Sequence, residues 1–441
     1  MKHIFPALQW ALFILMSSVV IPVTIAASFG LDPGGTVEFV QRSLFVLGVA
    51  GLLQTFFGHR LPIQEGPAGL WWGVFSLYAG LGTVLFGSHS ETLRVLEFAF
   101  ILSGLIFILL SVFGLVEKLS KLFTPAVTGI YLILMVVQLS SSFLKGMFGL
   151  SGEHPVVNPE ILLLSALIII FSYAFRRVPK VGHYSVLASI VFGWAAFAVL
   201  GLADQPMHAA HLFKLPALFA FGLPRIEAEL VFMVLFITLL LLANMLATVK
   251  VVQGVLERQG IPVEHSRMRQ TGIVSGINQL LAGSFSAIGP VPISGSAGFI
   301  STTRITGRLP FIIGSLVIIG ISLFPPFTAF VSAIPVAVGY AAVFPVFAST
   351  ISLAFQEFES LEDKSNLFQV AGISLFAGIG TMFIPTEAFS SMSPVLTSIL
   401  SNGLVFGAII AVVAERILMN RSGKAGETEK EKAVREAHHR A

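Results

Sequence analysis

Long runs of apolar residues, separated by short clusters of charged ones, follow one another along almost the whole chain. A helix needs about 20 predominantly apolar residues to cross the hydrocarbon core of a membrane. Nine runs of roughly this length each predict one crossing: residues 5–28, 41–57, 98–116, 122–144, 161–175, 184–203, 230–249, 365–386 and 390–416. The pattern therefore predicts a helical protein that spans a membrane many times.

Three further stretches do not fit one straight helix each. Residues 309–356 are long enough for two helices, with a break expected near Pro325. Residues 271–303 are cut by the Gly-Pro-Val-Pro sequence at 289–292, which predicts one helix and a shorter, interrupted one. Residues 66–88 open with Gly-Pro and are rich in glycine. These stretches bring the predicted total to fourteen spans, of which the third and the tenth are interrupted.

Two short strings in the interrupted spans resemble each other. Residues 62–69 and 292–298 both begin with Pro-Ile and reach Gly-x-Ala-Gly. A second pair, residues 125–129 and 335–339, begins with proline and ends with glycine. Seven spans separate the members of each pair, and because seven is odd, the copies point in opposite directions. The sequence thus predicts an all-α integral membrane protein of 14 transmembrane segments, a 7+7 inverted repeat with short interrupted helices at spans 3 and 10.

Interrupted helices point to a function. They expose backbone N–H and C=O groups, which are tolerated at membrane depth only inside the protein or along a cavity. Half-helix N-termini would present donors and positive dipole ends to a polar solute near the middle of the membrane. The breaks therefore predict a transporter.

Composition and charge restrict the class of protein and give its orientation. Charged side chains make up 11% of the 441 residues, against about 25% in ordinary globular chains. This excludes a soluble enzyme, a secreted domain and a nucleic-acid binder. With the N-terminus inside, the inner loops before the tail hold fifteen Lys and Arg residues and the outer loops five. The positive-inside rule then predicts a multi-pass cell-membrane protein with both termini cytoplasmic and a polar cytoplasmic tail at residues 421–441.

Several motifs resemble those of the nucleobase/ascorbate transporter family, the xanthine and uracil permeases. Leu-Gln-Trp at residues 8–10 is similar to the family's Leu-Gln-His in span one, and residues 125–129 are similar to its Pro-x-Val-Thr-Gly. Residues 335–339 match its Pro-x-x-x-Gly in span twelve. The family signature of span ten corresponds to residues 295–298, with Thr-Arg at 303–304. The resemblance covers nearly the whole chain.

The resemblance implies the domain organisation and the partners. A core domain would comprise residues 1–116 (spans 1–4) and 228–333 (spans 8–11). A gate domain would comprise residues 117–227 (spans 5–7) and 334–420 (spans 12–14), and the family often forms homodimers through the gates. It implies a secondary transporter that imports a purine base of the xanthine, uric acid, guanine or hypoxanthine type by proton symport with alternating access.

The same motifs indicate candidate site residues, with departures from the family pattern. The family usually has a glutamate where this chain has Asn244, and its uracil permeases have a histidine where Thr248 stands. Gly295 and Ser296 replace the acid or Gln and the Asn of the signature. The implied substrate-binding residues are Ala68, Gly69, Asn244, Thr248, Gly295 and Ser296, and the signature continues through Gly298, Thr303 and Arg304.

Two polar residues carry most of the expected chemistry. Asn244 interrupts an apolar span, where a polar group is costly unless it is satisfied inside the bundle. Its amide suits the mixed edge of a base, and the alternative is a hydrogen bond between helices. Glu65 precedes the break in span three and could be the proton ligand that replaces the missing carboxylates. Its alternative role is an interfacial helix cap.

Other functions remain open on the same fold. An anion or organic-acid carrier is one alternative, because a site that has lost its carboxylates accepts anions more readily. A facilitator without ion coupling is another. An enzyme is not expected, since the spans hold no nucleophile, paired-carboxylate or metal-ligand motif, and we expect neither a cofactor nor a metal.

Overall fold

The structure of the protein is a computed structural model. It describes residues 3–150, 156–179, 181–203, 211–332, 334–361, 366–389 and 402–418, together with residues 364, 392, 396, 399 and 400. The polar tail predicted at residues 421–441 lies outside the described residues, and so do parts of the span predicted at 390–416.

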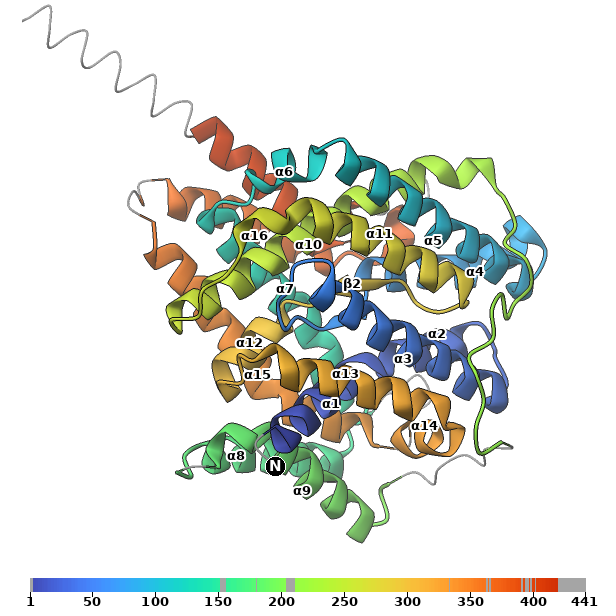
Figure 1. The fold of residues 1–441 in the computed structure, drawn as a ribbon, viewed down its shortest axis with the longest axis vertical. Coiled ribbons are helices and arrows are strands. Elements are labelled where there is room, and N and C mark those ends of the chain that lie inside the picture. The colour runs from blue at the N-terminus through green and yellow to red at the C-terminus, as the bar shows by residue number, and fades with distance from the viewer. Residues whose placement is uncertain are drawn as a thin grey trace, which may run out of the picture. The chain divides into compact units, whose positions relative to one another are not determined.

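The fold is predominantly helical, and Figure 1 shows the elements in chain order. The first half contains α1 (Ile4–Ser18), α2 (Val20–Ser28), α3 (Pro33–Phe56), β1 (Glu65–Pro67), α4 (Gly69–Phe86), α5 (His89–Val112), α6 (Leu115–Ser120), α7 (Pro125–Met147), α8 (Pro159–Arg176) and α9 (Ser185–Val199). The second half contains α10 (Val231–Arg258), α11 (Met268–Ser284), β2 (Pro290–Pro292), α12 (Gly295–Thr303), α13 (Arg308–Leu323), α14 (Pro325–Ser332), α15 (Val336–Glu359) and α16 (Leu367–Met382). Residues 403–418 are also helical.

Among the described residues, seven helical stretches are long and apolar enough to cross a membrane. They are Ile4–Val23, Pro33–Phe56, His89–Val112, Pro125–Met147, Pro159–Arg176, Met233–Arg258 and Val336–Glu359. Helices α9, α13 and α16 are apolar but shorter. The helical, multi-pass character predicted from the sequence is confirmed, while the total of fourteen spans in a 7+7 repeat stays a prediction.

The structure differs from the predicted helices in two places. The run at residues 309–356 holds three helices, because the short α14 lies between α13 and α15. The predicted break is where α13 ends and Pro325 opens α14, a position that suits proline because a first helical residue needs no N–H partner. Helix α10 continues well past residue 249, so Asn244 lies at its centre.

The chain divides into two compact units. One comprises Met1–Ser120 and Leu139–Thr350, and the other comprises Lys121–Gln138 and the described residues from Ile351 onward. Every contact discussed below lies within the first unit. The core and gate domains expected from the family resemblance stay a prediction.

The two interrupted spans meet at a small antiparallel sheet. Strand β1 pairs with β2, with Glu65 opposite Pro292 and Pro67 opposite Pro290. Helix α4 begins directly after β1, and α12 begins shortly after β2. The two breaks thus run in opposite directions at their contact, as the inverted repeat predicts there. The strands themselves were not expected from the sequence.

Glycine allows the helices around this sheet to approach closely. A Cβ atom on Gly104 of α5 would lie 2.6 Å from the Gly276 carbonyl oxygen of α11. A Cβ atom on Gly283 of α11 would lie 2.8 Å from the Glu97 carbonyl oxygen of α5. A Cβ on Gly314 of α13 would lie 2.9 Å from the Trp10 side chain of α1. Small residues at helix contacts are the usual basis of tight packing in membranes.

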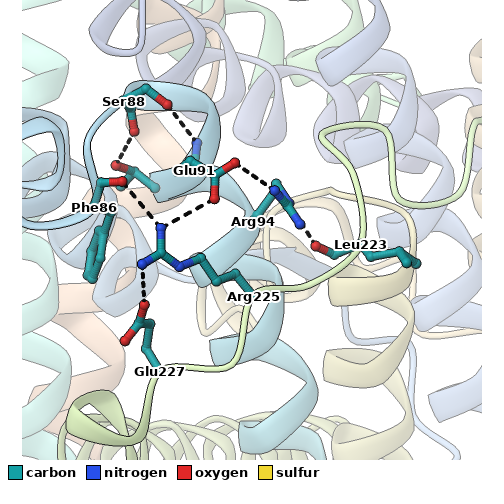
Figure 2. A network of polar contacts seen from close by, with 8 residues as sticks. Phe86, Ser88, Glu91, Arg94, Leu223, Arg225 and Glu227 are labelled. Atoms are coloured by element: carbon teal, nitrogen blue, oxygen red, sulfur yellow. Dashed lines mark hydrogen bonds and ion pairs between the residues drawn. The ribbon is translucent and has the colours of Figure 1, made fainter.

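An ionic network fastens the segment before α10 to the start of α5 (Figure 2). Arg94 binds Glu91 at 2.6 Å, and Arg225 reaches the other oxygen of Glu91 at 3.3 Å and Glu227 at 2.8 Å. Ser88 caps α5 by accepting the Glu91 N–H at 3.1 Å. These side chains are about one-third exposed, so each pair contributes little alone.

A second, buried polar cluster fixes the turn between α11 and β2. Ser286, whose φ of 49° is rare outside glycine, donates its hydroxyl to Glu97 of α5 and accepts the Ala220 N–H at 2.7 Å. The Ser286 carbonyl accepts the Nε–H of Arg42 from α3 at 3.3 Å, and Arg42 also lies 5.1 Å from the centre of the Phe221 ring. This cluster joins α3, α5 and the loop that contains Ala220 and Phe221 to the turn that precedes β2.

Replacing Arg42 by methionine should destabilise the protein much more than replacing Arg225 by glutamine. Arg42 is only 3% exposed, donates to the Ser286 carbonyl, and is attracted electrostatically by Glu38 and Glu97, so its loss leaves a buried carbonyl without its donor. A buried group left without its hydrogen-bond partner costs about 1–3 kcal/mol, whereas an exposed pair is worth roughly 0–1 kcal/mol. Thermal unfolding of the purified protein in detergent measures both effects. Equal, small losses would show that the buried cluster does not hold the turn.

Candidate functional site

The candidate site is built around the contact of β1 with β2. Ladder pairing continues past the strands, since the Ile293 N–H donates to the Gln64 carbonyl at 2.9 Å and the Ala68 N–H donates to the Gly289 carbonyl at 3.0 Å. The polar backbone groups freed by the two breaks are thus largely satisfied by each other. This matters because unpaired backbone groups are costly where no water reaches them.

Helix α10 supports β2 through two candidate residues one turn apart. The Asn244 amide donates to the Pro292 carbonyl at 3.2 Å, and the Thr248 hydroxyl reaches the same carbonyl at 3.2 Å. Thr248 also contacts the Ser294 hydroxyl at 2.6 Å. Thr248 is fully buried, whereas Asn244 is half-buried.

The start of α12 is bonded to the approach to β1. The Ser296 hydroxyl accepts the Gln64 N–H at 2.9 Å, and the Ser296 N–H donates to the Ile293 carbonyl at 3.0 Å. The Ser296 donor that the sequence offered to a substrate is therefore engaged within its own turn. Gly295 lies beside Phe347, and a Cβ on it would be 3.3 Å from that ring.

The start of α4 contains the open side of the site. Ala68 is fully buried, but Gly69 is exposed, and no protein atom lies within 4 Å of where a Cβ on Gly69 would stand. No side chain caps the start of α4. The first N–H groups of the helix are therefore not bonded to a capping side chain, and the positive end of the helix dipole lies there. Gly69 thus leaves room for a ligand next to a helix N-terminus.

Glu65 is the most unusual residue of the site. It lies in β1, is 1% exposed, and neither carboxylate oxygen has a hydrogen-bond partner among the described residues. An interfacial cap would be solvated, which does not fit this burial. An isolated carboxylate charge is expensive to bury, so this position favours a bound proton or a ligand that donates hydrogen bonds.

The turn that leads into β1 is firmly fixed. Arg267 donates to the Gly58 carbonyl at 2.7 Å and to the Phe57 carbonyl at 3.0 Å. His59 accepts the Leu61 N–H on Nδ1 at 3.0 Å. Burial lowers the pKa of His59 to about 3, so the ring stays neutral and remains an acceptor at physiological pH.

Sequence reasoning missed a layer of amides and hydroxyls behind the strands. The Gln64 amide bonds to Ser17 at 2.7 Å and to Ser18 at 3.0 Å, both on α1. Gln279 of α11 donates to the Pro290 carbonyl at 2.7 Å and accepts the Trp71 indole N–H at 3.0 Å. The available signals were the repeated Pro-Ile string, which contains Gln64, and the position of Gln279 as a polar residue within a span, which predicts packing between helices.

The rest of the family signature lies away from the strands. Gly298 packs against α15, where a Cβ would be 2.5 Å from the Val346 carbonyl oxygen. Thr303 bonds to the Phe299 carbonyl at 2.8 Å, and Arg304 ends α12 with a left-handed φ of 60°. The structure thus brings together Glu65, Ala68, Gly69, Asn244, Thr248, Gly295 and Ser296, but not Thr303 and Arg304.

Trp10, which stands where the family has a histidine, is a packing residue. It is fully buried, lies 4.2 Å from the Phe299 ring centre, and meets Phe311 edge-on at 5.1 Å. This aromatic cluster fixes α1 against α12 and α13. The Trp10 indole N–H stands where the family has an imidazole, and among the described residues it has no hydrogen-bond partner.

Solved structures show the fold to which this architecture belongs. The transmembrane domain of the cyanobacterial bicarbonate transporter BicA matches with a TM-score of 0.56 and 14% identity, covering 93% of this chain and 96% of that one. At this identity the likeness concerns the fold alone.

Relatives by sequence are permeases. "Putative purine permease YwdJ" of Bacillus subtilis (strain 168) is 41% identical over 429 residues, covering 96% of this chain and 98% of that one. "Uric acid permease PucK" of the same organism is 24% identical, covering 92% and 93%. The family model for xanthine/uracil permeases, described as "Permease family", matches residues 1–387. The resemblance drawn from the motifs is thereby confirmed, and the chain belongs to the xanthine/uracil permease family.

Proposed function

We propose that the protein is a secondary active transporter that imports a purine base by proton symport with alternating access. Membership of the permease family and the similarity to purine and uric acid permeases support a nucleobase as the substrate. The observation that carries the proposal is Glu65, a buried carboxylate without a described partner at the contact of two interrupted helices. Such a group can exchange a proton as part of a transport cycle.

The base would lie against the open side of the site. Gly69 leaves space for a flat ring beside the start of α4, and the α4 dipole favours an electron-rich carbonyl there. The half-buried Asn244 would use its amide to pair with the donor and acceptor edge of the ring. Ala68, Thr248, Gly295 and Ser296 would shape the site chiefly by holding the strands and the helix starts in position.

A carrier of anions or organic acids is the second candidate, because BicA has the same fold. Glu65 argues against it. An anion near the strands would meet a carboxylate that has no described cation to balance it, and like charges in a low dielectric repel strongly. A neutral base could instead donate N–H hydrogen bonds to the Glu65 carboxylate, which would lower the free-energy cost of burying it.

The wider organisation follows from the family. Spans 1–4 and 8–11 would form the core domain that carries the site, and spans 5–7 and 12–14 the gate domain through which two copies pair. The protein would lie in the cell membrane with both termini cytoplasmic. Alternating access would move the core against the gate.

Uptake measurements test the function directly. Cells lacking their own base permeases and expressing this chain should accumulate radiolabelled xanthine, uric acid, guanine or hypoxanthine. Unlabelled purines should compete, while pyrimidines and simple anions such as bicarbonate should compete weakly. A proton uncoupler should abolish accumulation. Accumulation of an anion alone would support the second candidate, and equilibration without accumulation would support a facilitator.

Replacing Glu65 by glutamine should abolish proton-driven accumulation. The amide keeps the shape of the side chain but cannot exchange a proton at physiological pH. Substrate binding to the purified variant should remain measurable, and Glu264→Gln, an exposed acid outside the site, should transport like the wild type. Normal accumulation with unchanged pH dependence in Glu65→Gln would show that the transported proton binds at another residue.

Replacing Asn244 by leucine should weaken binding of the base roughly ten- to a hundredfold. A buried hydrogen-bonding partner left unpaired costs about 1–3 kcal/mol, and 1.4 kcal/mol corresponds to tenfold. Because Asn244 also supports β2, the control is Gln279→Leu, which removes a bond to β2 from α11. Equal losses of binding affinity in the two variants would show that Asn244 acts only by supporting β2. Asn244→Glu should shift selectivity toward solutes with paired N–H donors.

A further inference from the structure

A large cavity lies at the opposite end of α12 from the candidate site. Its volume is about 940 Å³, and it is an open pocket lined by the start of α1, the end of α3, the α12–α13 turn and the start of α13. His3, Thr55, Phe56, Arg304, Arg308 and Leu309 are among its lining residues. Cavities of roughly 300–1,000 Å³ are typical of small-ligand sites. Helix α12 has nine residues, so about 13 Å of helix separates this cavity from Gly295.

Two arginines give the cavity its charge. Arg304 and Arg308 both line it and both are exposed, and within the described residues neither guanidinium group makes an ion pair or a hydrogen bond. The lining includes a histidine, His3, but no acidic residue. Helix α13 also begins here without a side-chain cap or an acid in its first turn. The cavity is therefore positively charged and lacks a counter-charge of its own.

Two other arginines, Arg60 and Arg267, differ from Arg304 and Arg308 because each has an acidic partner. Arg60 lies 3.9 Å from Glu264, and Arg267 lies 3.8 Å from the same acid. Arg267 also donates to two backbone carbonyls in the turn before β1. Glu264 thus pairs with both of these arginines, whereas the guanidinium groups of Arg304 and Arg308 have no ion-pair partner among the described residues.

The rim of the cavity is strongly apolar. Phe56 and Leu309 line it and are 48% and 50% exposed, and Ile4 and Phe5 at the start of α1 are 61% and 55% exposed. Because α1, α3 and α13 all have an end here, the cavity lies at a membrane face if these apolar helices cross the membrane. An occupant that satisfies both features needs an anionic group and hydrocarbon chains.

We propose that this cavity binds the phosphate of an acidic phospholipid. Arg304 and Arg308 would hold the phosphate oxygens with their planar guanidinium groups, which suit bidentate phosphate binding. The acyl chains would follow Phe56, Leu309 and the first turn of α1 into the membrane. Basic pockets between membrane helices are suited to acidic headgroups. The bound lipid would fix the α12–α13 turn, and with it the helix that begins at the candidate site.

Lipid binding to the purified, delipidated protein tests this proposal without measuring transport. Thermal unfolding is followed with added phosphatidylglycerol, with phosphatidylcholine and with inorganic phosphate. Phosphatidylglycerol should raise the unfolding midpoint, and the other two should not. Equal stabilisation by phosphatidylcholine would overturn the charge argument. Equal stabilisation by inorganic phosphate would assign the site to a free anion and overturn the assignment to a lipid.

Variants identify the residues responsible. The double variant Arg304→Gln, Arg308→Gln should lose on the order of thirtyfold in apparent affinity for phosphatidylglycerol, since each arginine contributes about fivefold. Arg308→Gln alone, at the exposed start of α13, should lose about fivefold, and it serves if the double variant does not fold. Arg269→Gln removes an exposed arginine outside the cavity and should bind like the wild type. Unchanged binding in Arg308→Gln, or equal loss in Arg269→Gln, would refute the site.

Discussion

The backbone groups freed where two helices break impose the main constraint on this structure. Inside a membrane-spanning bundle those groups must be bonded within the protein. Strands β1 and β2 meet this need by pairing with each other, and the surrounding helices add further donors. Asn244 and Thr248 reach β2 from α10, Gln279 reaches it from α11, and Gln64 connects the approach to β1 with α1. Several buried polar side chains from three different helices therefore serve this one contact.

Within that well-bonded region, Glu65 stands out because its carboxylate is buried without a described partner. Each neighbouring group is engaged: Gln64 with two serines, and Ser296 with Gln64. A network that leaves one ionisable group unsatisfied is unstable unless that group is neutral or meets a ligand. Glu65 is therefore a buried carboxylate without a described partner, four residues before the open space at Gly69. This coincidence links the proposed proton site with the proposed base site.

The sequence predicted the helices and the two breaks well, since apolar runs, glycines and prolines are local signals. It could not predict how the breaks pair. The repeated strings align Gly66 with Gly295, yet Gly66 lies in β1 and Gly295 opens α12, because strand pairing depends on contacts distant in the sequence. The buried cluster of Arg42, Glu97 and Ser286 was missed for the same reason: its members are separated by as many as 244 residues. Resemblance supplied most of the candidate site, but Gln64 and Gln279 became visible as supports only through their contacts.

Helix α12 connects these features physically. Its first turn is bonded to the approach to β1 through Ser296, and its last residues form the turn that contains Arg304. Along its length Gly298 lies so close to α15 that no larger side chain fits, and Ser349 of α15 approaches both Gly298 and Thr302. The nine-residue helix α12 therefore links the strand contact, the Arg304 turn and α15 within one short element. Helix α15 contains Pro345 and continues past Thr350 into the residues of the second unit. The part of α15 that contacts α12 and the first residues of the second unit thus belong to one continuous helix.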